Sequence, residues 1–325
     1  MNTKPMRATA RAQPNIALIK YWGKRDVPRN LPAVGSISIT LAELFTEMQV
    51  EPDPGLRQDR LFVNEREDRQ MLPRISRCLD SVGGPDRPAA VVHSACNFPI
   101  AAGLASSAAA FAALVVAANA ALRGSRTTAE LASLAGLASG SAARSLYGGF
   151  AELSNRGDDI EVRNLLDADA WPLRVVVAIT TSARKAVGSG DAMETSRKTS
   201  PFFDRWVNQQ GEDLDEARQA IAARDFEKLG AVAEHNCLKM HSVMWASRPP
   251  MIYWNSATIA CMQAVRDLQS EGVAVFFTID AGPQLKAVCL PDAEARVREA
   301  LTAVSGVANV MVSDLGAGAR LVANA

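Results

Sequence analysis

The chain has 325 residues, and its content of 48% hydrophobic and 22% charged residues is typical of a compact folded protein rather than a disordered one. Its 35 basic residues balance 35 acidic ones and form no long run, which argues against a nucleic-acid partner. A chain of this length exceeds what one hydrophobic core usually organises, so we expect two lobes.

The N-terminal segment and the cysteines bear on the cellular compartment. The first fifteen residues are basic but lack the apolar central region of a secretory signal. Five cysteines are scattered without C-x-x-C or another metal-binding spacing, so we expect reduced, buried thiols rather than disulfides or a metal site. These features together predict a cytoplasmic protein.

In the first polar segment, residues 14–24, a strand-like apolar run ends at a lysine. Lys20 directly follows the apolar residues. A lysine in such surroundings needs an anion, supplied either by a ligand or by a carboxylate of the protein itself. Further along, the alternating apolar residues at 36–41 and 46–50 predict half-buried strands.

Residues 97–122 contain no charge, which leaves two interpretations: a membrane span, or a phosphate-binding loop before a buried helix. A span needs about 20 consecutive strongly apolar residues, whereas Pro99, Gly103 and two serines interrupt this run. The Ala-rich remainder predicts a helix over 106–122, packed on all sides and capped by the serines. Backbone N–H groups and the helix dipole converge at its N-terminus, which favours the phosphate-binding loop.

The segment from residue 138 to 150 places an arginine among small and hydroxyl residues. Ser141 and Arg144 are three positions apart, so they share a face if the segment turns helically. An arginine fork flanked by hydroxyls suits a carboxylate or a phosphate. The alternative is a helix start with serine caps and a surface arginine.

The second half of the chain mixes strands with longer amphipathic helices. No strict alternation of strand and helix appears, so we expect an α+β fold with lobes at residues 1–182 and 183–325. The clearest elements are strands at 174–180 and 274–279 and helices at 209–229 and 256–271. Asp280 ends the later strand directly before a Gly-Pro turn, where its carboxylate could orient a hydroxyl proton or cap the next element.

Taken in order, these segments resemble the diphosphomevalonate decarboxylase family of the GHMP kinase superfamily. The blocks that carry the resemblance are PNIALIKYWGKRD, NLPAVGSISITL, NFPIAAGLASSAAAFAAL, SGSAARSLYGGF, LKMHSVMW with SRPP, and FTIDAGP. The resemblance implies a two-lobed GHMP-kinase-like fold with the active site between an N-terminal ATP-binding lobe and a C-terminal lobe. It also implies ATP and Mg²⁺ as cofactors, a phosphorylated mevalonate as substrate, a homodimer, and neither membrane nor nucleic acid as partner.

The chemistry that the resemblance implies is an ATP-dependent decarboxylation that converts 5-diphosphomevalonate to isopentenyl diphosphate. The family phosphorylates the tertiary 3-hydroxyl, and loss of that phosphate and of carbon dioxide follows. By this resemblance Asp280 orients or deprotonates the hydroxyl, Lys20 neutralises charge, and Arg144 with Ser141 holds the substrate carboxylate. The remaining implied contacts are Tyr21, Lys24 and Ser139 to the substrate, Asn97, Gly103, Ser106 and Ser107 to the nucleotide, and Ser107 to magnesium.

The chain departs from the family pattern beside the expected substrate phosphates. Thr195 stands where the family usually has an arginine, and a lost charge-assisted contact weakens binding by roughly 1.5–3 kcal/mol. Arg184, Lys185 or Arg197 could replace it, or the substrate could be the monophosphate of a phosphomevalonate decarboxylase. Two further hypotheses are a kinase that stops after phosphoryl transfer and an inactive relative that only binds ligand.

Overall fold

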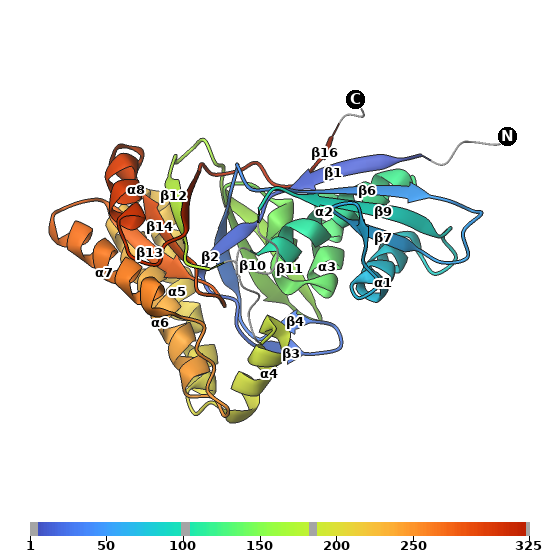
Figure 1. Cartoon of the computed structure of the whole chain (residues 1–325). Helices are drawn as coiled ribbons and strands as arrows, with labels where there is room; N and C mark the ends of the chain where they lie inside the picture. The colour runs from blue at the N-terminus through green and yellow to red at the C-terminus, as the bar shows by residue number, and fades with distance from the viewer. Residues whose placement is uncertain (1–5, 99–104, 182–186, 323–325) are drawn as a thin grey trace.

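The structure is a computed structural model that describes residues 6–98, 105–181 and 187–322. It confirms the predicted α+β fold: several largely antiparallel sheets are covered by helices, and the chain forms two lobes that lie side by side (Figure 1). In the described part of the chain, no helix is long and apolar enough to cross a membrane.

The first lobe is built on a six-stranded sheet with the order β16-β1-β6-β9-β7-β8. Helices α1 and α2 pack on one face of this sheet, and α3 packs against them and against β11 of the second sheet (Figure 1). The strands are β1 (Ala8–Ala12), β6 (Thr46–Pro52), β7 (Arg60–Val63), β8 (Arg66–Glu67), β9 (Ala90–Cys96) and β16 (Arg320–Val322). The helices are α1 (Leu72–Gly83), α2 (Ser106–Ala121) and α3 (Thr128–Ala138).

A second sheet of four strands, in the order β11-β10-β5-β2, lies between the first sheet and the second lobe. Its strands are β2 (Asn15–Ile19), β5 (Ser36–Thr40), β10 (Phe150–Arg156) and β11 (Asp159–Leu166), and a hairpin of β3 (Lys24–Asp26) and β4 (Leu31–Pro32) lies beside it. The strand predicted at 36–41 is confirmed as β5, but its half-buried character was wrong, because every residue of β5 is buried. Ile37 and Ile39 join the hydrophobic core, while Ser36 and Ser38 bond a buried arginine.

The second lobe packs five helices around a sheet with the order β13-β14-β12-β15. The strands are β12 (Arg174–Ile179), β13 (Val275–Ile279), β14 (Leu285–Cys289) and β15 (Asn309–Ser313), and the helices are α4 (Ser189–Thr199), α5 (Phe203–Ala223), α6 (Phe226–Trp245), α7 (Ser256–Ser270) and α8 (Glu294–Thr302). The strands at β12 and β13 and the helix α7 confirm the prediction.

The helix predicted at 209–229 was wrong, because the chain breaks inside it. Arg224 takes a left-handed conformation with φ 54°, which ends α5. The side chain of Asp225 then accepts a hydrogen bond from the backbone N–H of Lys228 at 3.0 Å and caps α6. Apolar periodicity continues on both sides of this turn, so the pattern alone did not reveal the break.

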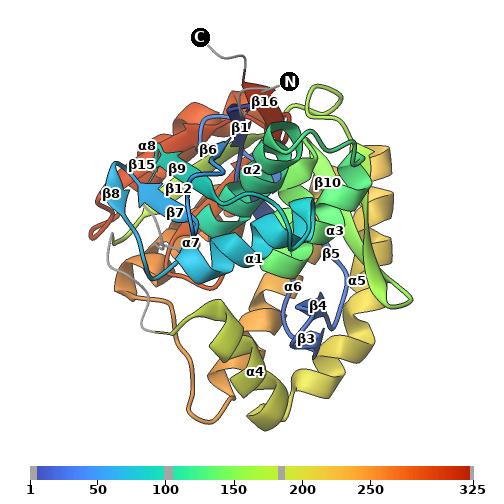
Figure 2. The ribbon, with the colours of Figure 1, turned by 90° about the vertical axis from the view of Figure 1, so that its right-hand side faces the viewer.

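The two lobes share part of their hydrophobic core. One buried cluster contains Ile37 and Ile39 of β5 together with Val175 of β12 and Leu214 of α5. The chain also returns at its end, because β16 pairs with β1, and the two strands lie side by side in Figure 2. The two lobes are thus interlocked, and the lobe boundary predicted between residues 182 and 183 stays a prediction.

Candidate active site

A cavity of about 1190 Å³ opens between the lobes, and strands β2 and β3, helices α1, α2 and α4 and the segment after β13 all contribute to its wall. Nine of the predicted site residues line it: Lys20, Tyr21, Lys24, Ser106, Ser107, Ser139, Ser141, Arg144 and Asp280. Asn97 does not, because its exposed side chain donates to the carbonyl of Glu43 at 2.7 Å and accepts from the backbone of Phe45. Gly103 lies outside the described residues.

Lys20 of the first lobe forms an ion pair with Asp280 of the second lobe. The Lys20 Nζ lies 2.7 Å from Asp280 Oδ1 and also donates to the carbonyl of Ala17 at 2.8 Å. The lysine side chain is 1% exposed, whereas the carboxylate is 23% exposed and faces the cavity. The apolar surroundings of Lys20 in the sequence called for a nearby anion. That anion is the carboxylate of Asp280 in the second lobe.

The backbone at Lys20 is held from the second lobe as well. Asn236 of α6 accepts a hydrogen bond from the backbone N–H of Lys20 at 2.7 Å. Gln210 of α5 donates to the carbonyl of Lys20 at 2.7 Å. Because both amides are buried and bonded to each other, the end of β2 has a fixed place relative to the helices of the second lobe.

A second ammonium, which the motif reasoning missed, lies on the other side of Asp280. Lys286 of β14 is fully buried, and its Nζ lies 3.4 Å from Asp280 Oδ2. Burial raises the pKa of Asp280, but the charges of Lys20 and Lys286 outweigh this effect and hold the pKa well below its usual value. The sequence signal for Lys286 was the same as the one used for Lys20, namely a lysine among the apolar residues of a strand.

Arg144 is a buried residue, so the interpretation as a surface arginine was wrong. It lies in a 3₁₀ helix, Gly140–Leu146, and is 2% exposed. Its Nε donates to Ser38 Oγ at 2.9 Å, its Nη2 donates to Asn15 Oδ1 at 3.0 Å, and its Nη1 bonds Ser36. These neutral partners orient the guanidinium without neutralising it.

Burial lowers the pKa of Arg144 to about 10, so the guanidinium stays charged at neutral pH. Among the described residues, no carboxylate lies within 4.0 Å of it. A buried cation that lines a cavity without a close anion of the protein is an arrangement that suits an anionic ligand.

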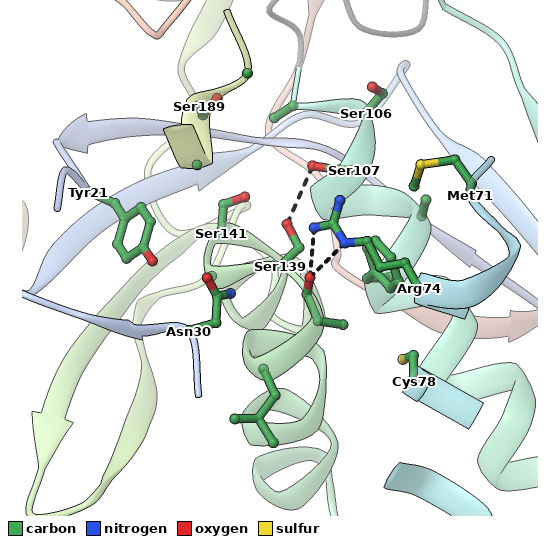
Figure 3. Close-up of a pocket in the computed structure, with 18 of the residues that line it drawn as sticks. Tyr21, Asn30, Met71, Arg74, Cys78, Ser106, Ser107, Ser139, Ser141 and Ser189 are labelled. Atoms are coloured by element: carbon green, nitrogen blue, oxygen red, sulfur yellow. Dashed lines mark hydrogen bonds between the residues drawn. The ribbon is translucent and has the colours of Figure 1, made fainter. Parts of the chain in front are cut away.

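The N-terminus of α2 opens onto the same cavity. Its N-cap is Ala105, in a left-handed conformation with φ 52° and without a side-chain cap, so the predicted serine cap was wrong. Ala105 has no side chain that could offset the helix dipole at this end. Ser106 and Ser107 occupy the first turn, and Figure 3 shows the hydroxyl of Ser107 directed toward that of Ser139, 3.4 Å away.

These features fit a phosphate chain with its counter-ion. An uncapped helix end attracts anions, and adjacent hydroxyl groups are ligands that a phosphate-bound Mg²⁺ accepts. The described residues contain no group of three or more His, Cys, Asp or Glu side chains that could hold a metal ion alone. Ser106 and Ser107 carry the described hydroxyl groups that could contact such an ion at this helix end.

Tyr21 and Gly140 pack closely at the edge of the cavity. The Tyr21 hydroxyl is buried without a hydrogen-bond partner among the described residues, and burial raises its pKa far above its usual value. In Figure 3 it lies on the same side of the site as Ser141 and Asn30. A Cβ atom on Gly140 would overlap this hydroxyl.

We expect Gly140→Ala to raise the KM of the anionic substrate about tenfold, because Tyr21 must leave its place. Steady-state kinetics with the substrate varied at saturating nucleotide measures this effect. The matched control is Gly211→Ala in α5, where an added methyl group meets nothing within 4 Å. Equal kinetics in the two variants would contradict the expected role of Tyr21.

Four further cations line the cavity: Lys24 on β3, Arg29 between β3 and β4, and Arg74 and Arg77 on α1. Burial, with the charge of Arg74 as a second cause, lowers the pKa of Lys24. Arg74 was missed by sequence reasoning; its guanidinium donates to the carbonyl of Ala138 at 2.6 Å and lies over Phe111 (Figure 3). Lys24 and Arg74 are placed to contact an anionic ligand between them.

Thr195, the departure from the family pattern, is half-buried in α4. Arg197, one of the three candidate replacements, is exposed and pairs with Glu194 at 2.7 Å. Arg184 and Lys185 lie outside the described residues. Apart from Lys20 and Arg144, the described cations that line the cavity are Lys24, Arg29, Arg74 and Arg77, and Arg29 is paired with Asp26.

Comparison with known proteins gives one consistent result. Residues 12–162 match the diphosphomevalonate decarboxylase-like N-terminal domain, and residues 175–317 match the mevalonate 5-diphosphate decarboxylase C-terminal domain. The diphosphomevalonate decarboxylase of Eremothecium gossypii is 34% identical over 92% of this chain and 81% of its own, and the human one is 33% identical over 89% and 78%.

Solved structures agree with the sequence matches. The crystal structure of mevalonate diphosphate decarboxylase from Staphylococcus aureus is similar, with a TM-score of 0.90 and 34% identity over 97% of this chain and 98% of that one. A second structure, described as MDDEF in complex with MVAPP, AMPPCP and magnesium, has a TM-score of 0.90 and 32% identity over 98% of this chain and 99% of that one.

Proposed function

Because the chain belongs to the diphosphomevalonate decarboxylase family, we propose that it converts 5-diphosphomevalonate, with ATP, to isopentenyl diphosphate, ADP, phosphate and carbon dioxide. The observation that carries the proposal is the contact of 2.7 Å between Lys20 and Asp280, made across the two lobes at the wall of a cavity. The uncapped end of α2 and the buried guanidinium of Arg144 lie along the same cavity.

The first chemical requirement is a tertiary hydroxyl group that attacks a phosphoryl group. In our proposal the ionised Asp280 accepts a hydrogen bond from the substrate 3-hydroxyl and orients its oxygen for attack. The hydroxyl proton transfers to Asp280 as the new oxygen–phosphorus bond forms and the bond from the γ-phosphorus of ATP to its bridging oxygen breaks, which releases ADP. Lys20 lies beside that hydroxyl oxygen and offsets the negative charge that gathers on the reacting groups.

The second requirement is loss of the new phosphate together with carbon dioxide. When the carbon–oxygen bond at C3 breaks, the electron pair leaves with phosphate, and positive charge develops at C3. The bond between the carboxylate and C2 then breaks, and its electrons form the carbon–carbon double bond. We assign Arg144 and Ser141 to the substrate carboxylate, because an arginine held by three neutral partners keeps a fixed orientation.

The nucleotide phosphates belong at the N-terminus of α2 in this proposal, with Ser106 and Ser107 as hydroxyl contacts. Mg²⁺ bound with ATP would neutralise charge on the phosphates, and Ser107 is the residue placed to hold it. The five cysteines, all within the described residues, are free, which supports a reducing, cytoplasmic location. The predicted homodimer remains a prediction.

We assign the substrate phosphates to Lys24 and Arg74, and Thr195 tests this assignment. Thr195→Arg should improve the use of the diphosphate over the monophosphate about ten- to a hundredfold in kcat/KM, because a charge-assisted contact contributes roughly 1.5–3 kcal/mol. Competition between 5-phosphomevalonate and 5-diphosphomevalonate in one reaction measures the ratio. An unchanged ratio would mean that other residues bind the terminal phosphate of the substrate.

The experiment that tests the proposed function is an assay of ADP, phosphate and carbon dioxide with mevalonate, its 5-phosphate and its 5-diphosphate. We expect all three products in equal amounts with the diphosphate. ADP without carbon dioxide would identify a kinase, and preference for the monophosphate would identify a phosphomevalonate decarboxylase. ATP binding without any turnover would overturn an enzymatic function.

A further inference from the structure

A cluster of polar groups surrounds Asp280, and the proposed reaction does not use all of them. Lys20 closes one side of it from the first lobe, and Lys286 closes the other from the second. Thr278 joins the cluster, since its hydroxyl donates at 3.2 Å to the same Ala17 carbonyl that receives the Lys20 ammonium. Each carboxylate oxygen of Asp280 therefore faces its own ammonium group.

Lys286 has an unusual place for a lysine. It lies in β14, the strand between β13 and β12, where it is paired with Thr278 and Val177. Every residue of β14 is buried, and the lysine is 1% exposed. A buried ion pair is often no more stabilising than a well-packed apolar pair, so folding alone does not explain an ammonium here.

The cavity distinguishes the two lysines. Lys20 and Asp280 belong to the described residues that line it, whereas Lys286 does not. A ligand in the cavity thus meets the carboxylate and Lys20 while Lys286 stays behind them. We propose that Lys286 is a positioning residue of the reaction, which holds the carboxylate of Asp280 from behind so that its other oxygen meets the substrate hydroxyl.

This inference rests on the proposed function and adds a residue to it. The charged and titratable groups that face Asp280 are Lys20 directly after β2, Lys286 on β14, Arg144 on the 3₁₀ helix, and Cys237 and His241 on α6. Burial lowers the pKa of His241 to about 3 and raises that of Cys237, so neither carries charge at neutral pH. Lys286 is therefore the nearest cation on the side of Asp280 that faces away from the cavity.

The sign of the pH effect follows from this arrangement. Asp280 has to be ionised to act, so activity falls as the pH drops through its pKa. The two lysines lower that pKa, and removal of one lets burial raise it toward or above the ordinary value of about 3.9. The acidic limb of kcat/KM should therefore move to higher pH when Lys286 loses its charge.

The test compares Lys286→Met and Lys286→Gln with the wild-type enzyme between pH 5 and 8. We expect Lys286→Met to lower kcat about 10- to 100-fold while the KM for ATP changes less than about threefold, since a misplaced carboxylate affects the chemical step. In a profile extended down to pH 4, its kcat/KM should also fall about twofold or more from the value at pH 7, whereas the wild-type value changes less. Lys286→Gln keeps a neutral donor that is one atom shorter, so it should recover part of kcat but keep the displaced limb.

Several outcomes would overturn the inference. Wild-type kinetics and an unchanged pH profile in Lys286→Met would remove any role in the reaction. Failure of both variants to fold, measured by circular dichroism, or an equal loss of active protein with no pH shift, would make the lysine a folding element only. Lys228→Met, at a partly exposed lysine that bonds Gln219, is the control. A wild-type enzyme that releases no carbon dioxide would instead count against the proposed function.

Discussion

Asp280→Asn is expected to abolish turnover, with kcat lowered about 10²- to 10⁴-fold, while ATP affinity changes only a few-fold. An amide has the shape of the carboxylate, but it cannot accept the substrate proton and carries no charge to match Lys20 and Lys286. The nucleotide phosphates are assigned to α2, away from this carboxylate. Rapid-quench measurement of ADP and carbon dioxide, together with calorimetric titration of ATP, gives the two quantities separately.

The control for this prediction is Asp292→Asn, the same chemical change at an exposed position in the turn before α8. Removal of one partner from a buried ion pair also destabilises a protein, by about 3–5 kcal/mol in typical cases. Chemical denaturation should therefore accompany the kinetics. If ATP binding is lost as completely as turnover in protein that remains folded, Asp280 has a structural role and the assignment is wrong.

Arg144→Met is expected to raise the substrate KM about 10- to 100-fold and to lower kcat by a further factor of about 10². The substrate would lose the charged group assigned to its carboxylate, and the reacting carbon would lose its alignment. Arg144→Lys should recover little of this loss, because an ammonium cannot bond Asn15, Ser36 and Ser38 and also present a fork to the ligand.

Stability has to be separated from function in the arginine variants as well. Each buried group left without its bond can cost about 1–3 kcal/mol, so urea unfolding is measured on every variant. Ser36→Ala removes one partner of Arg144 and leaves the guanidinium, and it should show a smaller effect in the same direction. Arg57→Met at an exposed position is the neutral control. An Arg144→Met enzyme with unchanged substrate KM would move the carboxylate site elsewhere.

The sequence by itself determined the elements whose signal is local. The Ala-rich run predicted α2, the continuous apolar runs predicted β12 and β13, and the amphipathic period predicted α7. It also placed Lys20 and Asp280 at the ends of apolar strands, where an ion needs a counter-ion. The motif blocks pointed to the family because such blocks preserve chemistry over long evolutionary distances.

The tertiary structure decided which polar groups meet. Ser36 and Ser38 read as the solvent side of a strand, yet they are buried because Arg144 arrives from a segment more than a hundred residues away. The antiparallel register of β13 and β14 sets Lys286 opposite Thr278, two residues before Asp280. No local pattern contains that register.

The physical reason is the range of the interactions involved. Helix period, strand alternation and turn residues act over a few positions, so they can be recognised directly in the sequence. Strand register, the burial of a charge and the pairing of ions from two lobes depend on groups that only folding brings together, and their energies are set by the surroundings that folding creates. The sequence named the lysine and the aspartate, and the packing of the two lobes brought them within 2.7 Å of each other and placed a second lysine behind them.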